Sequence, residues 1–153
     1  MEIKFLVDYP EHVEMVSNWI YKEFIEGIRA GISYELILKS CGARNKDSLP
    51  ISLIALKNNI CVGTISLFEN DLKERRDLSP WLGALYVDKE FRNQGIAKQL
   101  IDRIIEIAKE MKKDKIYLRT EHASEYYKKL GWIFVLKTID GFNLNTEVYM
   151  KEI

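Results

Sequence analysis

The sequence predicts an α/β (α+β) fold: one domain with a mixed, mostly antiparallel twisted sheet of about seven strands and helices on both faces. Three observations predict it. A strand at 82–87, a helix at 95–112 and a strand at 115–120 form a βαβ unit, which joins parallel strands. The other β-rich runs meet at short turns, which require antiparallel pairing. The 153 residues suffice for one core, and no linker or repeat divides them, so we expect a single domain over 1–153.

The first part of the chain combines one strand pattern with two helix patterns. Apolar residues alternate over 3–9, which predicts a strand. Pro10 begins a helical pattern with acids in its first turns, which suits the helix dipole, and Gly27 is its expected end. A second helix is expected after Ser33, a favourable N-cap, with Gly42 as its end.

The remaining part is richer in strands. Asn58 and Asn59 join two β-rich runs, and this pair predicts a hairpin turn because asparagine tolerates positive φ. A short helix over 124–131 precedes two final strand-like runs. The helix at 95–112 is strongly amphipathic, with an apolar stripe formed by Ile96, Leu100, Ile104, Ile107, Ala108 and Met111.

Composition excludes several classes of protein. Acidic and basic residues balance at 23 each, which argues against a general nucleic-acid-binding surface. No apolar stretch approaches the roughly 20 residues of a membrane span, and the N-terminal residues do not resemble a signal peptide. Cys41 and Cys61 are far apart and in no metal-binding spacing, so we expect free thiols and no metal site. A cytoplasmic protein is therefore expected, with neither nucleic acid nor membrane as a partner.

The beginning of the long helix has unusual chemistry. Gly95 starts it without a side-chain cap, and its first acid, Asp102, comes two turns later. Unpaired N–H groups and the positive end of the helix dipole favour an anion such as phosphate. Arg92 and Lys98 add positive charge, and Ala97 is small. The spacing alone fits both an anion site and an ordinary helix that follows a glycine loop.

A family resemblance narrows this choice. The stretch "YVDKEFRNQGIAKQL" resembles the acyl-CoA pyrophosphate loop of the GNAT superfamily of N-acetyltransferases, whose pattern Arg/Gln-x-x-Gly-x-Gly/Ala is matched by Arg92, Gly95 and Ala97. "SEYYKKLGW" resembles the segment Phe-Tyr-x-x-x-Gly-Phe/Trp of that family, and "PWLGALYV" its fourth strand. The resemblance covers nearly the whole chain. It implies a GNAT-like fold, splayed between strands 4 and 5, and acetyl transfer from acetyl-CoA to a primary amine.

The resemblance also implies where acetyl-CoA binds. Pantetheine is expected along the backbone of Leu85, Tyr86 and Val87, in the gap between the splayed strands. Thr120 occupies a position often held by asparagine and is expected near the cofactor or the opened strand end. The diphosphate is expected at the loop formed by Arg92, Asn93, Gln94, Gly95, Ile96, Ala97 and Lys98.

The resemblance indicates a candidate for the catalytic acid but does not identify the general base. Tyr127 aligns with the tyrosine that protonates the departing thiolate in many relatives, although a tyrosine on a short helix also simply packs. Relatives with a clear general base often carry a glutamate on the fourth strand, and here that position falls near Trp81. Glu69 and Asp71, at the end of the third strand, are the nearest candidates for the base; a polar strand end in solvent explains them equally well.

The sequence does not identify the molecule that accepts the acetyl group. A small-molecule or peptide amine is expected, with its site formed by the first two helices and the loops 25–35 and 71–80. Two alternatives are a non-catalytic acyl-CoA-binding sensor or partner module of the same fold, and an interaction domain without a CoA site. The missing fourth-strand acid favours the first of these. The sequence fits a monomer or a homodimer.

Overall fold

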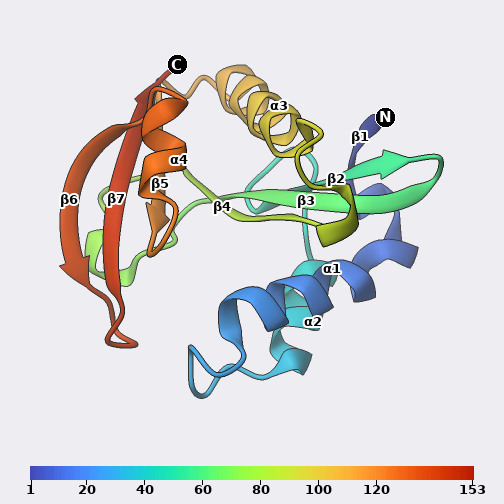
Figure 1. Cartoon of the computed structure of the whole chain (residues 1–153), viewed down its shortest axis with the longest axis horizontal. Coiled ribbons are helices and arrows are strands. Elements are labelled where there is room, and N and C mark those ends of the chain that lie inside the picture. Colours follow the sequence, from blue (N-terminus) through green and yellow to red (C-terminus); the bar gives the residue numbers. More distant parts are fainter.

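One seven-stranded sheet runs through the protein in the order β1-β2-β3-β4-β5-β7-β6. The computed structural model describes residues 1–153 (Figure 1). Every neighbouring pair is antiparallel except β4 and β5, which are parallel. The predicted mixed, mostly antiparallel sheet is therefore confirmed. Its strands are β1 (Glu2–Phe5), β2 (Ile51–Lys57), β3 (Ile60–Phe68), β4 (Trp81–Val87), β5 (Lys115–Thr120), β6 (Ile133–Ile139) and β7 (Asn145–Glu152).

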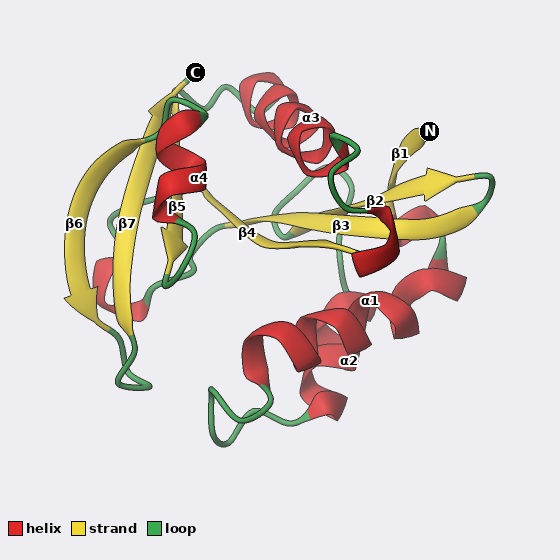
Figure 2. Ribbon diagram, in the orientation of Figure 1, coloured by secondary structure: helices red, strands yellow, loops and turns green.

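Helices cover both faces of this sheet, as predicted. In Figure 2, α3 (Ile96–Glu110) lies on one side of β2, β3 and β4, and α1 (Val13–Ile20) and α2 (Tyr34–Gly42) lie on the other. The short α4 (Ser124–Lys129) follows β5. The largest core cluster forms between α3 and the sheet, and a second one forms beneath α1 and α2. None of the helices is both long enough and apolar enough to cross a membrane.

The sheet opens between β4 and β5. Only Trp81 and Leu82 of β4 are in register with β5, opposite Tyr117 and Leu118. From Gly83 onward β4 pairs with β3 alone. The sheet is therefore splayed at this place, and the side of β4 that faces β5 has no strand partner along its second half.

A β-bulge bends β4 at the point of divergence. Ser66 of β3 opposes Gly83, whereas Thr64 opposes Tyr86, so β4 carries one residue more than β3 in this interval. Ala84 has φ +50°, a value that is rare for residues with a side chain. Bulges of this kind re-aim a strand and end its pairing. The bulge therefore contributes to the splay.

The structure confirms the predicted turns and caps in the first half of the chain. Asn58 and Asn59 have φ +51° and +65° in the hairpin between β2 and β3. The Ser33 hydroxyl accepts a hydrogen bond of 3.1 Å from the Leu36 N–H and caps α2, which ends at Gly42.

Two predicted elements differ from the structure. The strand expected over 3–9 ends at Phe5, and a 3₁₀ turn follows, because this turn buries Leu6 completely and leaves Val7 41% exposed. The helix expected from Pro10 to Gly27 is divided into a 3₁₀ turn, α1 and a π-helical turn over Tyr21–Ile25. Such π turns are frequent at functional sites, and residues of this one line the cavity of the candidate site.

Candidate active site

The N-terminus of α3 presents a row of free donors. Gly95 is its N-cap with φ +78°; no side chain caps the helix, and no acid lies in its first turn. The backbone N–H groups of residues 93–98 donate to no acceptor within the chain. A Cβ added at Gly95 would meet nothing within 4 Å, so the approach to the backbone is open. These residues fit an anion such as a diphosphate.

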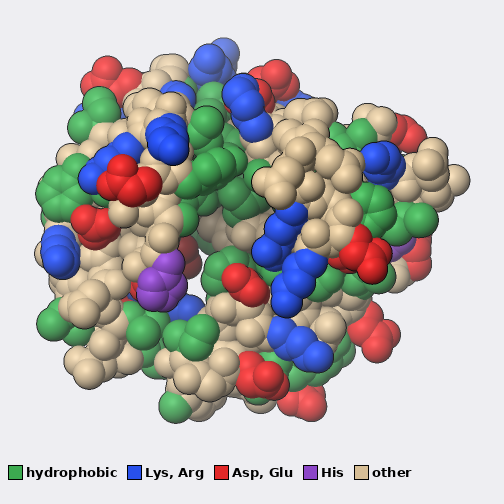
Figure 3. Space-filling view, in the orientation of Figure 1, with side chains coloured by type: hydrophobic (Ala, Val, Ile, Leu, Met, Phe, Trp, Pro, Cys, Tyr) green, Lys and Arg blue, Asp and Glu red, His purple; other side chains and the backbone are tan.

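Cationic side chains surround this row of donors. The Nε atom of Arg92 donates to the Val87 carbonyl at 2.9 Å, and its guanidinium lies over the Tyr86 ring at 5.3 Å. The ammonium of Lys98 contacts Asp102 at 2.8 Å, and both side chains are exposed. Figure 3 shows Lys and Arg side chains along one side of the central hollow. The surroundings therefore add positive charge at the end of β4.

A cavity of about 1060 Å³ occupies the space between the two halves of the molecule. Four of the predicted site residues line it together: Asp71, Leu85, Thr120 and Tyr127. The hollow is visible in Figure 3. Glu69 is exposed and does not line the cavity. Tyr86, Val87 and residues 92–98 lie outside the cavity lining, towards the end of β4 and the start of α3.

Tyr127 has a free hydroxyl in this cavity. The residue lies on α4, is 8% exposed and packs edge-on against the rings of Tyr126 and Trp132. Its hydroxyl makes no hydrogen bond within the chain. Burial, followed by the neighbouring Tyr126, raises the pKa of the Tyr127 hydroxyl to about 12. The phenol therefore stays protonated and available as a donor throughout the physiological pH range.

Asp71 is a half-buried carboxylate with a strongly shifted pKa. Burial raises the pKa of Asp71 to about 6, although Arg119 and Arg29 oppose this shift. The Arg119 guanidinium contacts the backbone carbonyl of Asp71 at 3.3 Å. A carboxylate with a pKa near 6 is ionised at neutral pH and is still basic enough to accept a proton.

Gly83 makes room for Asp71 on β4. A Cβ added at Gly83 would lie 3.1 Å from the Asp71 Oδ2 atom and 2.9 Å from the Phe68 ring. The carboxylate therefore stands over the fourth strand although it comes from the loop after the third. Trp81, which lies near the position of the family's glutamate, is fully buried and donates its Nε1–H to the Leu78 carbonyl at 2.6 Å.

Thr120 supports the position of Tyr127. Its hydroxyl accepts a hydrogen bond of 2.8 Å from the Ala123 N–H, at the turn that leads into α4. The residue is 8% exposed and lines the cavity. Thr120 thus fixes the start of the helix that carries Tyr127, a structural role that the sequence does not reveal.

A model of the acetyltransferase (GNAT) family matches residues 13–132 of the chain. The protein belongs to the GNAT acetyltransferase family. The match spans the free donors at α3, the opened strand β4 and Tyr127. No curated protein sequence matches this GNAT chain significantly.

Solved structures of other acetyltransferases share the fold of this GNAT protein. An aminoglycoside 6'-N-acetyltransferase complexed with coenzyme A is 17% identical, with a TM-score of 0.76 over 99% of this chain and 97% of that one. A ribosomal-protein-alanine N-acetyltransferase from Brucella melitensis is 21% identical, with a TM-score of 0.72 over 100% of both chains. A GNAT-family acetyltransferase from Staphylococcus aureus Mu50 is 22% identical, with a TM-score of 0.72 over 99% of both chains. At these identities the likeness establishes the fold.

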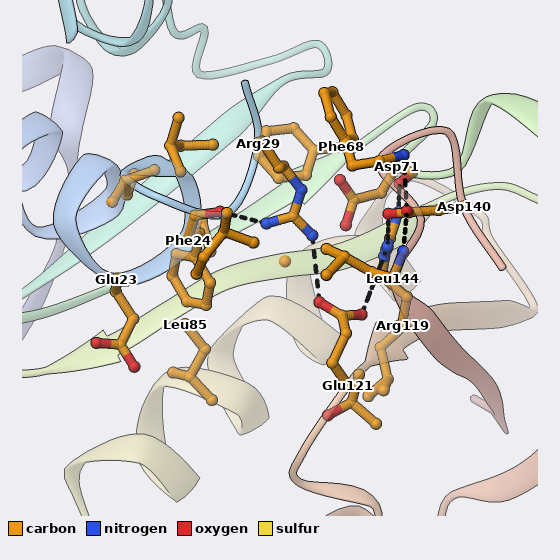
Figure 4. A pocket seen from close by; sticks show the side chains of 18 of the residues that line it. Glu23, Phe24, Arg29, Phe68, Asp71, Leu85, Arg119, Glu121, Asp140 and Leu144 are labelled. Carbon is orange, nitrogen blue, oxygen red and sulfur yellow. Dashed lines mark hydrogen bonds and ion pairs between the residues drawn. The ribbon is translucent and has the colours of Figure 1, made fainter. Parts of the chain in front are cut away.

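An ion-pair network in this GNAT domain lies outside the sequence prediction. Arg29, after α1, contacts Glu121 at 3.2 Å and also donates to the Phe24 carbonyl. Arg119 contacts Glu121 at 3.4 Å and also pairs with Asp140 (Figure 4). The four residues of the network line the cavity, and their contacts join the first third of the chain to the last. The one sequence signal for this network is an arginine, Arg119, within a strand pattern that is otherwise largely apolar. This signal does not identify its partners Glu121 and Asp140.

Proposed function

We propose that this protein transfers the acetyl group of acetyl-CoA to a primary amine by direct attack within a ternary complex. The observation that supports this proposal most strongly is the row of free N–H groups at the start of α3, together with a cavity that both Tyr127 and Asp71 line. The coarser assignment, an acetyltransferase family, rests on the family match.

The donor molecule supplies an acetyl group activated as a thioester. In the proposed complex its diphosphate accepts hydrogen bonds from the N–H groups of residues 93–98. Backbone groups of Leu85, Tyr86 and Val87 on the open side of β4 bind the pantetheine arm, where β5 provides no strand partner. The thioester then lies at the cavity, beside Tyr127.

Two side chains handle the protons of the reaction. The neutral amine attacks the carbonyl carbon, and Asp71 accepts the proton that the amine nitrogen loses as the C–N bond forms. As the new C–N bond forms and the C–S bond breaks, the Tyr127 hydroxyl donates a hydrogen bond or a proton to the departing sulfur. The raised pKa of Tyr127 keeps this donor protonated, and the raised pKa of Asp71 strengthens it as a base.

The cysteines do not favour an acyl-enzyme. Cys41 and Cys61 are both buried and free. Burial raises the pKa of the Cys61 thiol to about 11, so very little of it is the nucleophilic thiolate at neutral pH. Direct transfer from the thioester to the amine is therefore the favoured route.

The first experiment separates binding from catalysis. The protein is heated with and without CoA; a ligand at 100 times its Kd stabilises by about 2.7 kcal/mol, which gives a clear rise in Tm. Thiol release from acetyl-CoA is then measured with a panel of amines, and we expect turnover. A Tm shift without turnover of any amine would favour the non-catalytic acyl-CoA-binding module, and the absence of a Tm shift would favour an interaction domain without a CoA site.

The second experiment tests the acid. Tyr127→Phe removes the hydroxyl and keeps the ring, so we expect an unchanged CoA-induced Tm shift and a fall in kcat of about 10²–10⁴-fold. Tyr126→Phe, the same change on the exposed neighbour, is the matched control and should keep wild-type kcat. Full activity of Tyr127→Phe would exclude Tyr127 as the acid.

A further inference from the structure

Arg44 is a buried cation without an acidic partner. It follows α2, is 7% exposed and lines the same cavity as Asp71 and Tyr127. Arg29 and Arg119, which also line this cavity, are paired with Glu121 and Asp140. Arg44 forms no ion pair with any carboxylate of the chain. Burial lowers the pKa of its guanidinium, and Cys41 opposes this shift. A buried cation is costly unless an anion compensates it.

Hydrogen bonds fix the Arg44 guanidinium in one orientation. Its Nε donates to the Ser52 hydroxyl at 2.8 Å, and Nη1 donates to the carbonyl and hydroxyl of Ser40 at 3.0 and 2.9 Å. The Ser40 carbonyl belongs to the last turn of α2, so Arg44 also interacts favourably with the negative end of that helix. These contacts engage the Nε and Nη1 atoms of the guanidinium.

The remaining amino group of Arg44 is free. Nη2 makes no hydrogen bond within the chain. It is not fully buried, because Nε1 of Trp132 is the single fully buried side-chain nitrogen or oxygen that lacks a hydrogen-bond partner. Nη2 is therefore accessible to a ligand, and Arg44 is one of the residues that line the cavity. Fixed guanidinium groups of this kind bind carboxylates through charge-assisted hydrogen bonds.

The Phe68 ring lies close to both Arg44 and the candidate base, Asp71. The guanidinium of Arg44 lies over the face of the Phe68 ring at 5.1 Å. An edge of the same ring shares the space above Gly83 with the Asp71 carboxylate. The free cation and the candidate base therefore both lie near the Phe68 ring and line the same cavity.

The charges of the cavity disfavour a polycation. The deep carboxylates Glu121 and Asp140 are already paired with Arg29 and Arg119. Glu23 and Glu74 line the cavity but are exposed. A polycationic acceptor would therefore meet few unpaired buried acids, and it would bring further positive charge close to Arg44.

We propose that the acceptor is a small amine that also carries a carboxylate, with Arg44 binding the carboxylate while the amine is presented to Asp71. This inference rests on the proposed acetyl transfer and specifies its acceptor class as amino carboxylates, in preference to polycationic amines. The Arg44 side chain has the role of a specificity determinant and takes no part in the chemical step.

Matched amines test this assignment on the whole protein. Thiol release from acetyl-CoA is measured with glycine and glycinamide, with 4-aminobutyrate and butylamine, with lysine and cadaverine, and with kanamycin as a polycation. In at least one pair we expect the carboxylate-bearing member to have a kcat/KM at least tenfold higher, and kanamycin to be a poorer substrate than that member. Equal use of both members in every pair, or preference for kanamycin or the carboxylate-free amines, would overturn the proposal.

Variants localise the effect to Arg44. In Arg44→Gln we expect the discrimination within the preferred pair to collapse to about onefold, mainly through KM, and Arg44→Lys should keep part of it. Arg76→Gln removes the same charge from an exposed arginine of the cavity lining and should keep full discrimination. If Arg44→Gln lowers the activity towards both members equally, Arg44 has only a structural role and the proposal is wrong.

A binding measurement separates this inference from the proposed function. Isothermal titration of the CoA-bound wild-type protein with the same carboxylates does not depend on turnover. Binding that is lost in Arg44→Gln would support the site even if no amine is acetylated, in which case the proposed function alone fails. If none of the carboxylates binds, the proposal fails even if carboxylate-free amines are acetylated. If Arg44→Gln does not fold, Arg44→Lys and the comparison of matched amines on the wild type still decide.

Discussion

At the scale of single residues, Asp71 and Tyr127 share one cavity but differ in their expected proton states. Burial raises the pKa of both, to about 6 for the carboxyl and about 12 for the phenol. At pH 7 the first is a base without its proton and the second is a donor with its proton. The same physical cause therefore strengthens the carboxylate as a base and keeps the phenol protonated as a hydrogen-bond donor.

The pH dependence of the rate tests the role of Asp71. The neutral fraction of the amine falls tenfold per pH unit below the amine's pKa, so log(kcat/KM) against pH has a slope near one above pH 6. Below about 6 protonation of Asp71 should increase this slope towards two. In Asp71→Asn we expect a fall in kcat/KM of about 10²–10⁴-fold and no steepening. A steepening near pH 6 that persists in Asp71→Asn would assign it to another group.

The same residue should make a pH-dependent contribution to stability. The pKa of Asp71 is higher in the folded protein than in the unfolded chain, so the folded state binds more protons between about pH 4 and 6. The free energy of unfolding of the wild type should therefore fall relative to Asp71→Asn as pH rises through this interval. We expect a difference on the order of 1–3 kcal/mol, constant above about pH 7, by urea denaturation. A difference that does not vary with pH would contradict the raised pKa.

At the scale of elements, the start of α3 combines a weak cap with an exposed cationic residue. Lys98→Glu places an acid in the first turn of α3, where it interacts favourably with the dipole but loses the contact with Asp102. The stability of the free protein should change by less than about 0.5 kcal/mol, whereas the Kd for CoA should rise by about tenfold or more because the acid repels the diphosphate.

A matched change at the other end of the helix controls for net charge. Lys109→Glu makes the same charge change in the last turn of α3, on an exposed residue. Its Kd for CoA, measured by isothermal titration, should remain within about twofold of wild type, because charges separated by more than a Debye length are screened. Equal weakening in both variants would show a general charge effect and would remove the evidence for a diphosphate at this terminus.

The bulged strand β4 provides a second test at this scale. Gly83→Ala introduces a methyl group 2.9 Å from the Phe68 ring and 3.1 Å from Asp71, so these side chains must shift. Because misplacement by a fraction of an ångström reduces catalysis, we expect kcat to fall by about tenfold or more while CoA still raises Tm. Gly141→Ala, also in the cavity lining but with its nearest contact at 3.7 Å, is the control. Full activity of Gly83→Ala would show that Asp71 needs no fixed position.

At the scale of the whole molecule, the ion-pair network joins distant parts of the chain. Glu121 contacts Arg29, 92 residues away, and also Arg119 and the Thr146 hydroxyl. The side chains of Arg29 and Glu121 are 14% and 19% exposed, so solvent screens this pair only partly. The network therefore fixes the segment after α1 against the end of β5, within the lining of the cavity.

Removing one charge from this network should destabilise the whole fold. Glu121→Gln leaves two arginines without their shared anion, and we expect a loss of about 2–3 kcal/mol in the free energy of unfolding, slightly below the range for fully buried pairs. Glu106→Gln breaks an exposed pair with Arg103 and should change stability by less than about 1 kcal/mol. Similar losses in the two variants, measured by urea denaturation, would contradict a structural role of the network.

Local rules explain why part of this molecule was predictable from its sequence. The Asn58-Asn59 turn, the Ser33 cap and the open helix start at Gly95 each depend on neighbouring residues, so their chemistry is visible in a short stretch. The resemblance added the family, and it predicts a loop for CoA at residues 92–98. The secondary structure of residues 6–9 was not predictable from the sequence. Whether Leu6 or Val7 is buried depends on the helices that pack against this segment.

The acceptor side of the cavity depends on contacts between distant residues. Arg44 stacks on Phe68, and Arg29 reaches Glu121, only after the sheet has formed. Spacing along the sequence carries no signal for such pairs. Asp71 was one of two candidates at the end of the third strand, and the structure places it in the cavity while Glu69 stays exposed outside.

A crystal structure of the protein with acetyl-CoA tests the central claim most directly. We expect the diphosphate on the N–H groups of residues 93–98, the pantetheine arm beside Leu85, Tyr86 and Val87, and the sulfur within hydrogen-bond reach of the Tyr127 hydroxyl. Acetyl-CoA bound away from the opening between β4 and β5, or with its sulfur far from Tyr127, would contradict the account.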